Sequence, residues 1–167
     1  ILLGSVIIIL FFFLFDNLIN SGIKLKNYSN TNYSFIYDST WQFFDIQDQQ
    51  VELKHDNDGT LKIEYITLNN ENKYLALSDL IDDYTYKINS NNPDYKLLLR
   101  NSVTATSKNL DGYQLLYENQ TGQVMMVICK QSDKLIIFTF TASNECFDIL
   151  LDSANSIINN FTLCFFL

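Results

Sequence analysis

His55 is the single histidine of the chain, so a Ser–His–Asp or Cys–His catalytic arrangement would have to include it. It lies on the same face of its predicted strand as the apolar residues, at the end of a hairpin. A structural role is favoured there over a catalytic one. The sequence contains no Gly-x-Ser-x-Gly elbow, and its five glycines form no phosphate-binding loop. We therefore predict no catalytic residues and no cofactor.

The segment Asp56-Asn57-Asp58-Gly59 has the residue types of a calcium loop. If Gly59 took the sixth position of an EF-hand loop, Lys54 and Tyr65 would take the first and last positions. Neither side chain can supply the carboxylate needed there, which excludes an EF-hand. A weak cation site formed by Asp56 and Asp58 remains a hypothesis, and we predict no other metal site.

The three cysteines, Cys129, Cys146 and Cys164, are widely spaced and form no Cys-x-x-Cys pair. This spacing gives no support to zinc binding or thioredoxin-type chemistry. Cys129 lies inside an apolar strand and Cys146 opens a helix, so we predict buried free thiols. A Cys129–Cys146 disulfide is the alternative.

Composition narrows the classes of partner. Among 167 residues, 11 are Lys or Arg and 19 are Asp or Glu, giving a formal net charge of −8. Nucleic acids require clusters of basic side chains, so no nucleic-acid partner is predicted. Docking on anionic lipid through a basic face is excluded for the same reason. The acidic surface favours solubility, and recruitment of cations or of a basic partner is the functional alternative.

The N-terminal run Ile1 to Phe15 contains no charged residue. A helix needs about 20 apolar residues to span a bilayer, and this run is shorter. Because the chain begins without Met, we expect further residues upstream of it. We therefore predict residues 1–19 to be a transmembrane signal-anchor helix. A cleaved signal peptide is the alternative. A lipoprotein is excluded because it needs a Cys just after the apolar run, and the first Cys of the chain is Cys129. Residues 20–31 then form a polar stalk, and residues 32–167 form the folded domain on the extracytoplasmic side of the cell membrane.

The hairpin Val124 to Thr141 is the element around which the domain is organised. Its apolar residues do not alternate with polar ones, which is typical of strands covered on both faces. Lys130 to Lys134 form the polar turn between the two strands. Layers of structure are therefore expected on both sides of this part of the sheet.

Earlier strands are predicted at Tyr33 to Tyr37 and from Trp41, whose indole we expect to cover the core rather than to bind a ligand. Segments 51–55 and 61–65 alternate and form a hairpin at the periphery with one solvated face. Matching its apolar faces places Leu53 opposite Ile63, with Gly59 providing the positive φ of a three-residue turn.

Later elements follow from helical spacing and turn residues. Leu77 to Asn89 is predicted to be a helix capped by Ser78. A strand over 95–106, irregular at Asn101-Ser102, and another at 113–117 lead to the central hairpin. The last helix, capped by Ser143 or Asn144, has the clearest apolar stripe, and residues 161–167 form a closing strand or a tail.

This order of elements resembles the PsbP-like family, which includes the extrinsic PsbP protein of photosystem II and many bacterial membrane-anchored domains. The resemblance rests on Tyr33-Ser34-Phe35-Ile36-Tyr37 with Trp41, the helix from Leu77, and the final Ile157-Ile158-Asn159-Asn160-Phe161. The usual Pro before the Trp is replaced here by Ser39-Thr40. The resemblance implies an α+β fold, an antiparallel meander with helices on both faces, in an α/β/α sandwich. It implies no catalytic residues.

Three functions are consistent with these observations. The first is a non-catalytic, membrane-anchored extracytoplasmic binding or accessory domain, attached by its N-terminal helix and able to bind a protein partner. The second is a subunit of a larger cell-envelope complex. The third is a small hydrolase that uses scattered carboxylates.

Overall fold

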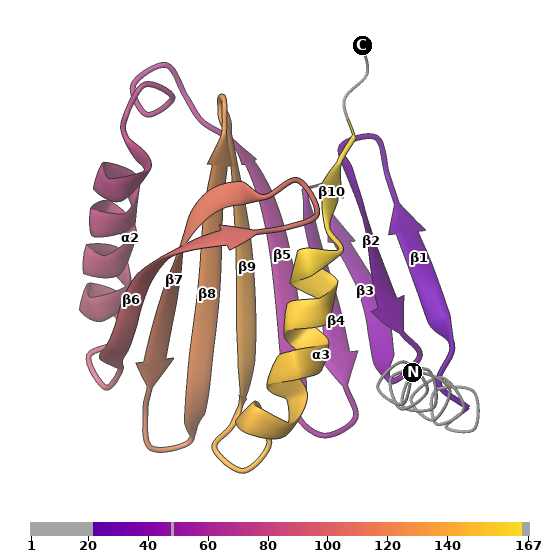
Figure 1. The fold of residues 1–167 in the computed structure, drawn as a ribbon. Coiled ribbons are helices and arrows are strands. Elements are labelled where there is room, and N and C mark those ends of the chain that lie inside the picture. The colour runs from indigo at the N-terminus through magenta and orange to yellow at the C-terminus, as the bar shows by residue number, and fades with distance from the viewer. Residues whose placement is uncertain (1–21, 48, 165–167) are drawn as a thin grey trace, which may run out of the picture.

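The computed structural model describes residues 22–47 and 49–164 (Figure 1). The predicted signal-anchor helix, residues 1–19, lies outside the described residues. Within them, no helix is long and apolar enough to cross a membrane.

The described chain forms ten strands and two helices. In chain order these are β1 (Leu25–Ser29), β2 (Tyr33–Asp38), β3 (Trp41–Gln47), β4 (Gln50–His55), β5 (Gly59–Thr67), α2 (Leu77–Asn91), β6 (Lys96–Ala105), β7 (Leu110–Glu118), β8 (Gly122–Gln131), β9 (Lys134–Ser143), α3 (Phe147–Asn159) and β10 (Thr162–Leu163).

The strands form two antiparallel sheets rather than the single predicted meander. Seven strands have the order β3-β4-β5-β9-β8-β7-β6, and three have the order β1-β2-β10. Helix α2 connects β5, in the middle of the large sheet, to β6 at its edge. The small sheet joins segments from both ends of the described chain (Figure 1).

The hairpin β8–β9 lies inside the large sheet and is buried on both faces, which confirms the central prediction. Val127 pairs with Phe138, and Ile128 pairs with Ile137. The first pair belongs to a core cluster that includes residues of α3, and the second to a cluster that includes residues of α2. Neighbouring residues of one strand point to opposite faces, so each face meets its own helix.

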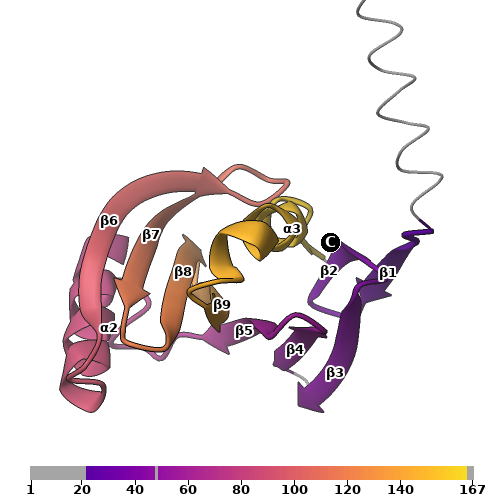
Figure 2. The same ribbon diagram turned by 90° about the horizontal axis from the view of Figure 1, so that it is seen from below.

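The two helices bury their apolar stripes against these opposite faces. Leu80 and Ile81 of α2 are buried, as are Leu150 and Ile157 of α3. Figure 2 shows α3 inside the curve of the large sheet and α2 outside it. The predicted helical cover on both faces is therefore present.

The predicted polar stalk over residues 20–31 is wrong for Leu25–Ser29, which form β1 and pair with β2. Tyr28 explains why the strand forms. Its ring centroid lies 5.1 Å from that of Phe35 and 4.7 Å from that of Phe43. One inward aromatic residue among polar neighbours gave too weak an alternation to reveal the strand.

The β4–β5 register also differs from the prediction. Leu53 pairs with Leu61 and Val51 with Ile63, so Glu52 faces Lys62 directly. The positive φ of the turn belongs to Asp58, at 62°. Gly59 instead lies within β5, where an added Cβ would sit 2.5 Å from Leu150 Cδ1. The missing side chain at Gly59 leaves room for the end of the Leu150 side chain of α3. Strand β5 is interior because it also pairs with β9.

Three smaller expectations were also wrong. The N-cap residues of α2 and α3 are Ala76 and Cys146, neither with a side-chain cap, rather than Ser78 and Ser143 or Asn144. The irregularity of β6 lies between Leu97 and Leu99 rather than at Asn101-Ser102.

The predicted closing strand is confirmed for Thr162–Leu163, which pair with β2.

Candidate functional site

His55 and Trp41 are held in structural contacts. Their rings meet edge to face with centroids 5.2 Å apart, and His55 Nδ1 accepts a 3.1 Å hydrogen bond from the backbone N–H of Asn57. Trp41 is fully buried and donates from Nε1 to Ser153 Oγ at 2.8 Å. Ser153 in turn donates to Asp38 Oδ2 at 3.0 Å. The prediction that Trp41 covers the core is confirmed, and the histidine stabilises the end of a hairpin.

The cysteines are free thiols in the structure. Cys129 is fully buried in β8, beneath Gly112, where an added Cβ would lie 2.8 Å from its sulfur. Burial, with a smaller contribution from the Asp111 carboxylate, raises the pKa of the Cys129 thiol to about 12. The thiolate is the nucleophilic form, so Cys129 is chemically inert near neutral pH.

Asp56 and Asp58, the candidate cation ligands, are exposed and lie in the turn between β4 and β5. Asp56 Oδ1 accepts a 2.9 Å hydrogen bond from Gln42 Nε2. Among the described residues, no group of three or more His, Cys, Asp or Glu side chains could hold a metal ion. The cation site stays a hypothesis. Asp58 also lines a cavity that is described below.

A cavity of about 390 Å³ lies between the first turn of α2 and the strands β6 and β7. We call it the helix cavity. Its wall combines the apolar Leu77, Val103 and Tyr113 with hydroxyls from Ser78, Ser102 and Thr104, and Asp111 contributes a carboxylate.

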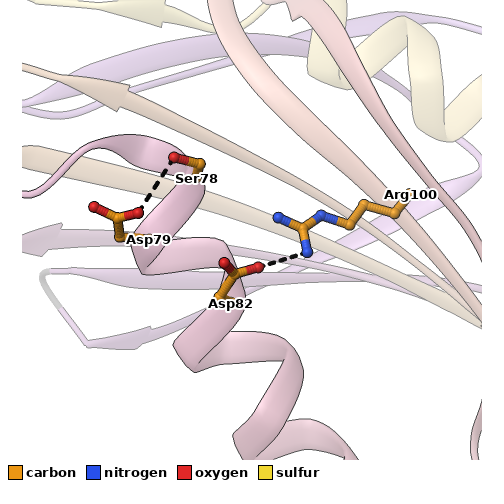
Figure 3. Close-up of polar contacts among 4 residues, drawn as sticks. All are labelled: Ser78, Asp79, Asp82 and Arg100. Atoms are coloured by element: carbon orange, nitrogen blue, oxygen red, sulfur yellow. Dashed lines mark hydrogen bonds and ion pairs between the residues drawn. The ribbon is translucent and has the colours of Figure 1, made fainter.

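Arg100 is the cation closest in sequence to this wall, and it is already paired. Its Nη1 lies 2.6 Å from Asp82 Oδ1 on α2, as Figure 3 shows, and its guanidinium carbon lies 5.5 Å from the centroid of the Tyr113 ring. One turn earlier, Ser78 Oγ is 3.5 Å from Asp79 Oδ1. Arg100 is thus paired with Asp82 and is not a free cation for an anionic ligand.

Two further cavities, of about 280 and 260 Å³, share Asn119 and Thr121 at one end of the large sheet. We call them together the strand-end site. It is defined by Asp58, Thr60, Tyr95, Asn119, Gln123 and Ser143 in the larger cavity and by Asp94 in the smaller one. Hydroxyl and amide groups dominate this surface, and such groups can both donate and accept hydrogen bonds.

Hydrogen bonds within the β7–β8 turn hold part of this site in place. Asn119 Oδ1 accepts from the backbone N–H groups of Thr121 and Gly122, each at 2.9 Å, and from Thr121 Oγ1 at 3.0 Å. The backbone N–H of Asn119 donates to the carbonyl of Gly122 at 3.0 Å. Such a turn is rigid because the side chain replaces a backbone partner.

Sequence reasoning did not predict the strand-end site. Asp58 was considered as a candidate metal ligand and not as part of such a site. Thr60, Tyr95 and Gln123 come from three separate elements, and no local spacing relates them. Their proximity depends on the pairing of β5 with β9 and of β9 with β8, which sequence patterning alone does not specify.

The arrangement of two antiparallel sheets and two helices around this hairpin is a PsbP-like fold. The cyanobacterial PsbP (CyanoP) of Synechocystis sp. PCC 6803 superposes with a TM-score of 0.63 at 16% identity, covering 83% of this chain and 92% of that one. A protein from Bacteroides thetaiotaomicron VPI-5482 gives 0.53 at 13% identity, over 83% of this chain and 48% of the other.

LpqN, described as involved in cell envelope biogenesis of Mycobacterium tuberculosis, gives a TM-score of 0.48 at 11% identity, covering 85% of this chain and 91% of that one. No family model matches the chain, and no curated protein matches it.

Proposed function

We propose that this protein is a non-catalytic accessory domain, anchored to the cell membrane by residues 1–19 and exposed on the extracytoplasmic side, where it binds a ligand or partner through its surface. One observation carries this proposal. The two faces of the central hairpin are filled by side chains from α2 and α3. Recognition must therefore use surface features, such as the helix cavity and the strand-end site.

The chemistry of the reactive residues supports a non-catalytic role. The single histidine contacts Trp41 and its own turn, and the thiol of Cys129 is protonated near neutral pH.

The apolar sequence Ile1 to Phe15 supports the location, because it precedes the described domain by only a few residues. The test is membrane fractionation of cells that express the full chain with a C-terminal tag. We expect the protein to resist alkaline extraction and to be degraded when protease is added to intact cells. Release by alkali, or protection until the cells are lysed, would contradict the proposal.

A subunit of a larger envelope complex is the second candidate, favoured by specific exposed side chains. Tyr74 is 82% exposed and Tyr86 is 73% exposed. Tyr is enriched at protein interfaces because it combines a large apolar ring with a polar hydroxyl. Cross-linking in intact membranes followed by purification tests this. A specific partner should disappear in a Tyr74→Ser, Tyr86→Ser variant and remain in a Tyr37→Ser variant that alters the small sheet.

A further inference from the structure

Three separate parts of the chain meet where neighbouring interior strands of the large sheet begin or end. They are the start of β5, the end of β9 and the turn from β7 into β8, all at the lower end of the sheet in Figure 1. The segment that follows α2 adds Tyr95 to the same surface. The strand-end site is therefore fixed by strand pairing and not by a long loop.

The polar groups of this site are almost all uncharged. Thr60, Thr121, Thr141 and Ser143 contribute hydroxyls, and Asn119 and Gln123 contribute amides. Asn119 Oδ1 is used within the turn, whereas its Nδ2 group makes none of those hydrogen bonds. A ligand that fits this surface must itself carry many groups that both donate and accept hydrogen bonds, and a polyhydroxylated ligand has that property.

Tyr95 gives the site one aromatic wall. Its ring packs edge to face against Tyr117, which is buried, with centroids 6.4 Å apart. The backbone N–H of Tyr95 also donates to the carbonyl of Asn92 at 3.0 Å. The ring is thereby held in position at the margin of the cavity. An aromatic ring beside hydroxyl and amide groups suits a molecule with one apolar face and a polar rim, such as a sugar ring.

Charge selects among saccharides. The described side chains that line the two cavities include no Lys, Arg or His, and their charged members are Asp58 and Asp94. A uronic acid, a sulfated sugar or a phosphate ester would meet two carboxylates without a compensating cation. These carboxylates would repel an anionic ligand, so the ligand is a neutral saccharide.

The site is built before any ligand arrives. Gly122 approaches β9 so closely that an added Cβ would lie 2.4 Å from the carbonyl oxygen of Ala142. Thr141 Oγ1 donates to the carbonyl of Thr60 at 3.5 Å, linking β9 to β5 beneath the cavity. Little ordering is needed on binding, and preorganisation of this kind favours affinity.

We propose that the strand-end site binds a neutral saccharide, with one sugar ring in each of its two cavities and the ring of Tyr95 against the larger one. Ligand sites usually have volumes of roughly 300–1,000 Å³. The two cavities, of about 280 and 260 Å³, each lie just below that range. This inference names a ligand for the accessory role proposed above and rests on it.

The test is an NMR titration of the full chain in micelles of a detergent that carries no sugar. N,N′-diacetylchitobiose is the neutral probe and digalacturonic acid the anionic one. We expect saturable shifts of the backbone amides of Thr60, Asn119 and Gln123 with the neutral probe and none with the anionic probe. Amides around the helix cavity, such as those of Ser102 and Thr104, should not move.

Two variants localise the binding. Thr60→Val keeps the shape of the side chain and removes its hydroxyl, and Gln123→Leu removes an amide. Each should weaken binding by about fivefold, the expected effect of one lost hydrogen bond. Thr67→Val is the matched control, because it makes the same change at the other end of the same strand and should bind as the wild type does.

The inference is overturned if the neutral probe produces no saturable shift, if digalacturonic acid binds as well, or if Thr60→Val and Gln123→Leu leave the affinity unchanged in folded protein. Cleavage of the probe during the titration would overturn the non-catalytic proposal and leave the saccharide site in place. An unexpected result in the membrane accessibility assay bears only on location, because the titration does not depend on it.

Discussion

The indole N–H of Trp41, in β3, donates a 2.8 Å hydrogen bond to the hydroxyl of Ser153, in α3, across 112 residues of chain. The Ser153 hydroxyl in turn donates a 3.0 Å hydrogen bond to Asp38 Oδ2. Trp41 is the largest fully buried side chain of the domain. A buried N–H group needs a partner, so this short relay fixes the last helix against the edge of the large sheet.

Replacing Ser153 with Ala should therefore lower the free energy of unfolding by about 1–3 kcal/mol, because the buried indole N–H would lose its acceptor. Ser156→Ala is the matched control, since Ser156 is exposed on the same helix. Urea denaturation followed by tryptophan fluorescence measures both. Equal effects of the two substitutions would show that the relay contributes nothing.

Gly59 and Gly122 should tolerate alanine differently. A Cβ at Gly59 would meet the end of the Leu150 side chain at 2.5 Å, whereas one at Gly122 would meet the Ala142 carbonyl oxygen at 2.4 Å. Overpacking of this kind costs about 1–3 kcal/mol when side chains can adjust, and more when backbone must move. In thermal denaturation, the melting temperature of Gly122→Ala should be lower than that of Gly59→Ala. Adding Leu150→Ala should restore part of the lost stability in the Gly59→Ala variant and none in the Gly122→Ala variant.

Cys129 should make stability depend on alkaline pH. Burial raises the pKa of its thiol from 9.0 to about 12. The unfolded chain ionises first, so the contribution to stability is complete below pH 9 and is lost as pH rises toward 12. The slope is about 1.4 kcal/mol per pH unit in that window.

Denaturation of the wild type and of Cys129→Ala at pH 8 to 11 measures this slope. Tyr65, Tyr84 and Tyr117 also have raised pKa values because they are partly buried, and they contribute in the same direction in both proteins. The difference between the two slopes isolates the thiol. Parallel slopes would mean that the thiol ionises as easily in the folded protein as in the unfolded chain.

The ion pair of Arg100 with Asp82 should contribute little to stability. The Asp82 side chain is 64% exposed, and solvent screens such pairs to about 1 kcal/mol or less. A double-mutant cycle with Arg100→Gln and Asp82→Asn measures the coupling, which should fall further when salt is added. A coupling of several kcal/mol that persists in salt would contradict this.

Calcium should not bind at Asp56 and Asp58. Calcium requires six to eight oxygen ligands, and Asp56 already accepts a hydrogen bond from Gln42. Isothermal calorimetry of the full chain with calcium should show no saturable heat. A saturable heat that disappears in an Asp56→Asn, Asp58→Asn variant would establish the cation site after all.

The sequence predicted those features that depend on burial pattern. The unbroken apolar runs of β8 and β9 require cover on both faces, and the structure provides it with α2 and α3. The stripe of α3 from Phe147 to Ile158 was equally clear, because helical spacing survives without knowledge of neighbours.

Pairing and close approach could not be predicted in the same way. Moving Leu53 from Ile63 to Leu61 keeps every apolar residue on its face, so patterning cannot choose between the two registers. In the structure Asp58 takes the positive φ and Gly59 already pairs with His55, so the turn lies one residue earlier than predicted. The strand-end site was missed for the same reason, since it exists only where β5, β9 and β8 are already aligned.

The small sheet carries a consequence for how the protein is made. Its middle strand, β2, pairs with β1 beside it and with β10 at the far end of the chain, where Thr162 meets Ser34. During synthesis β1 and β2 emerge well before β10, so the second edge of β2 stays unpaired until Thr162 and Leu163 have been made. Contacts between such distant segments slow folding. Strand β2 is therefore translated before the large sheet and is completed only after it.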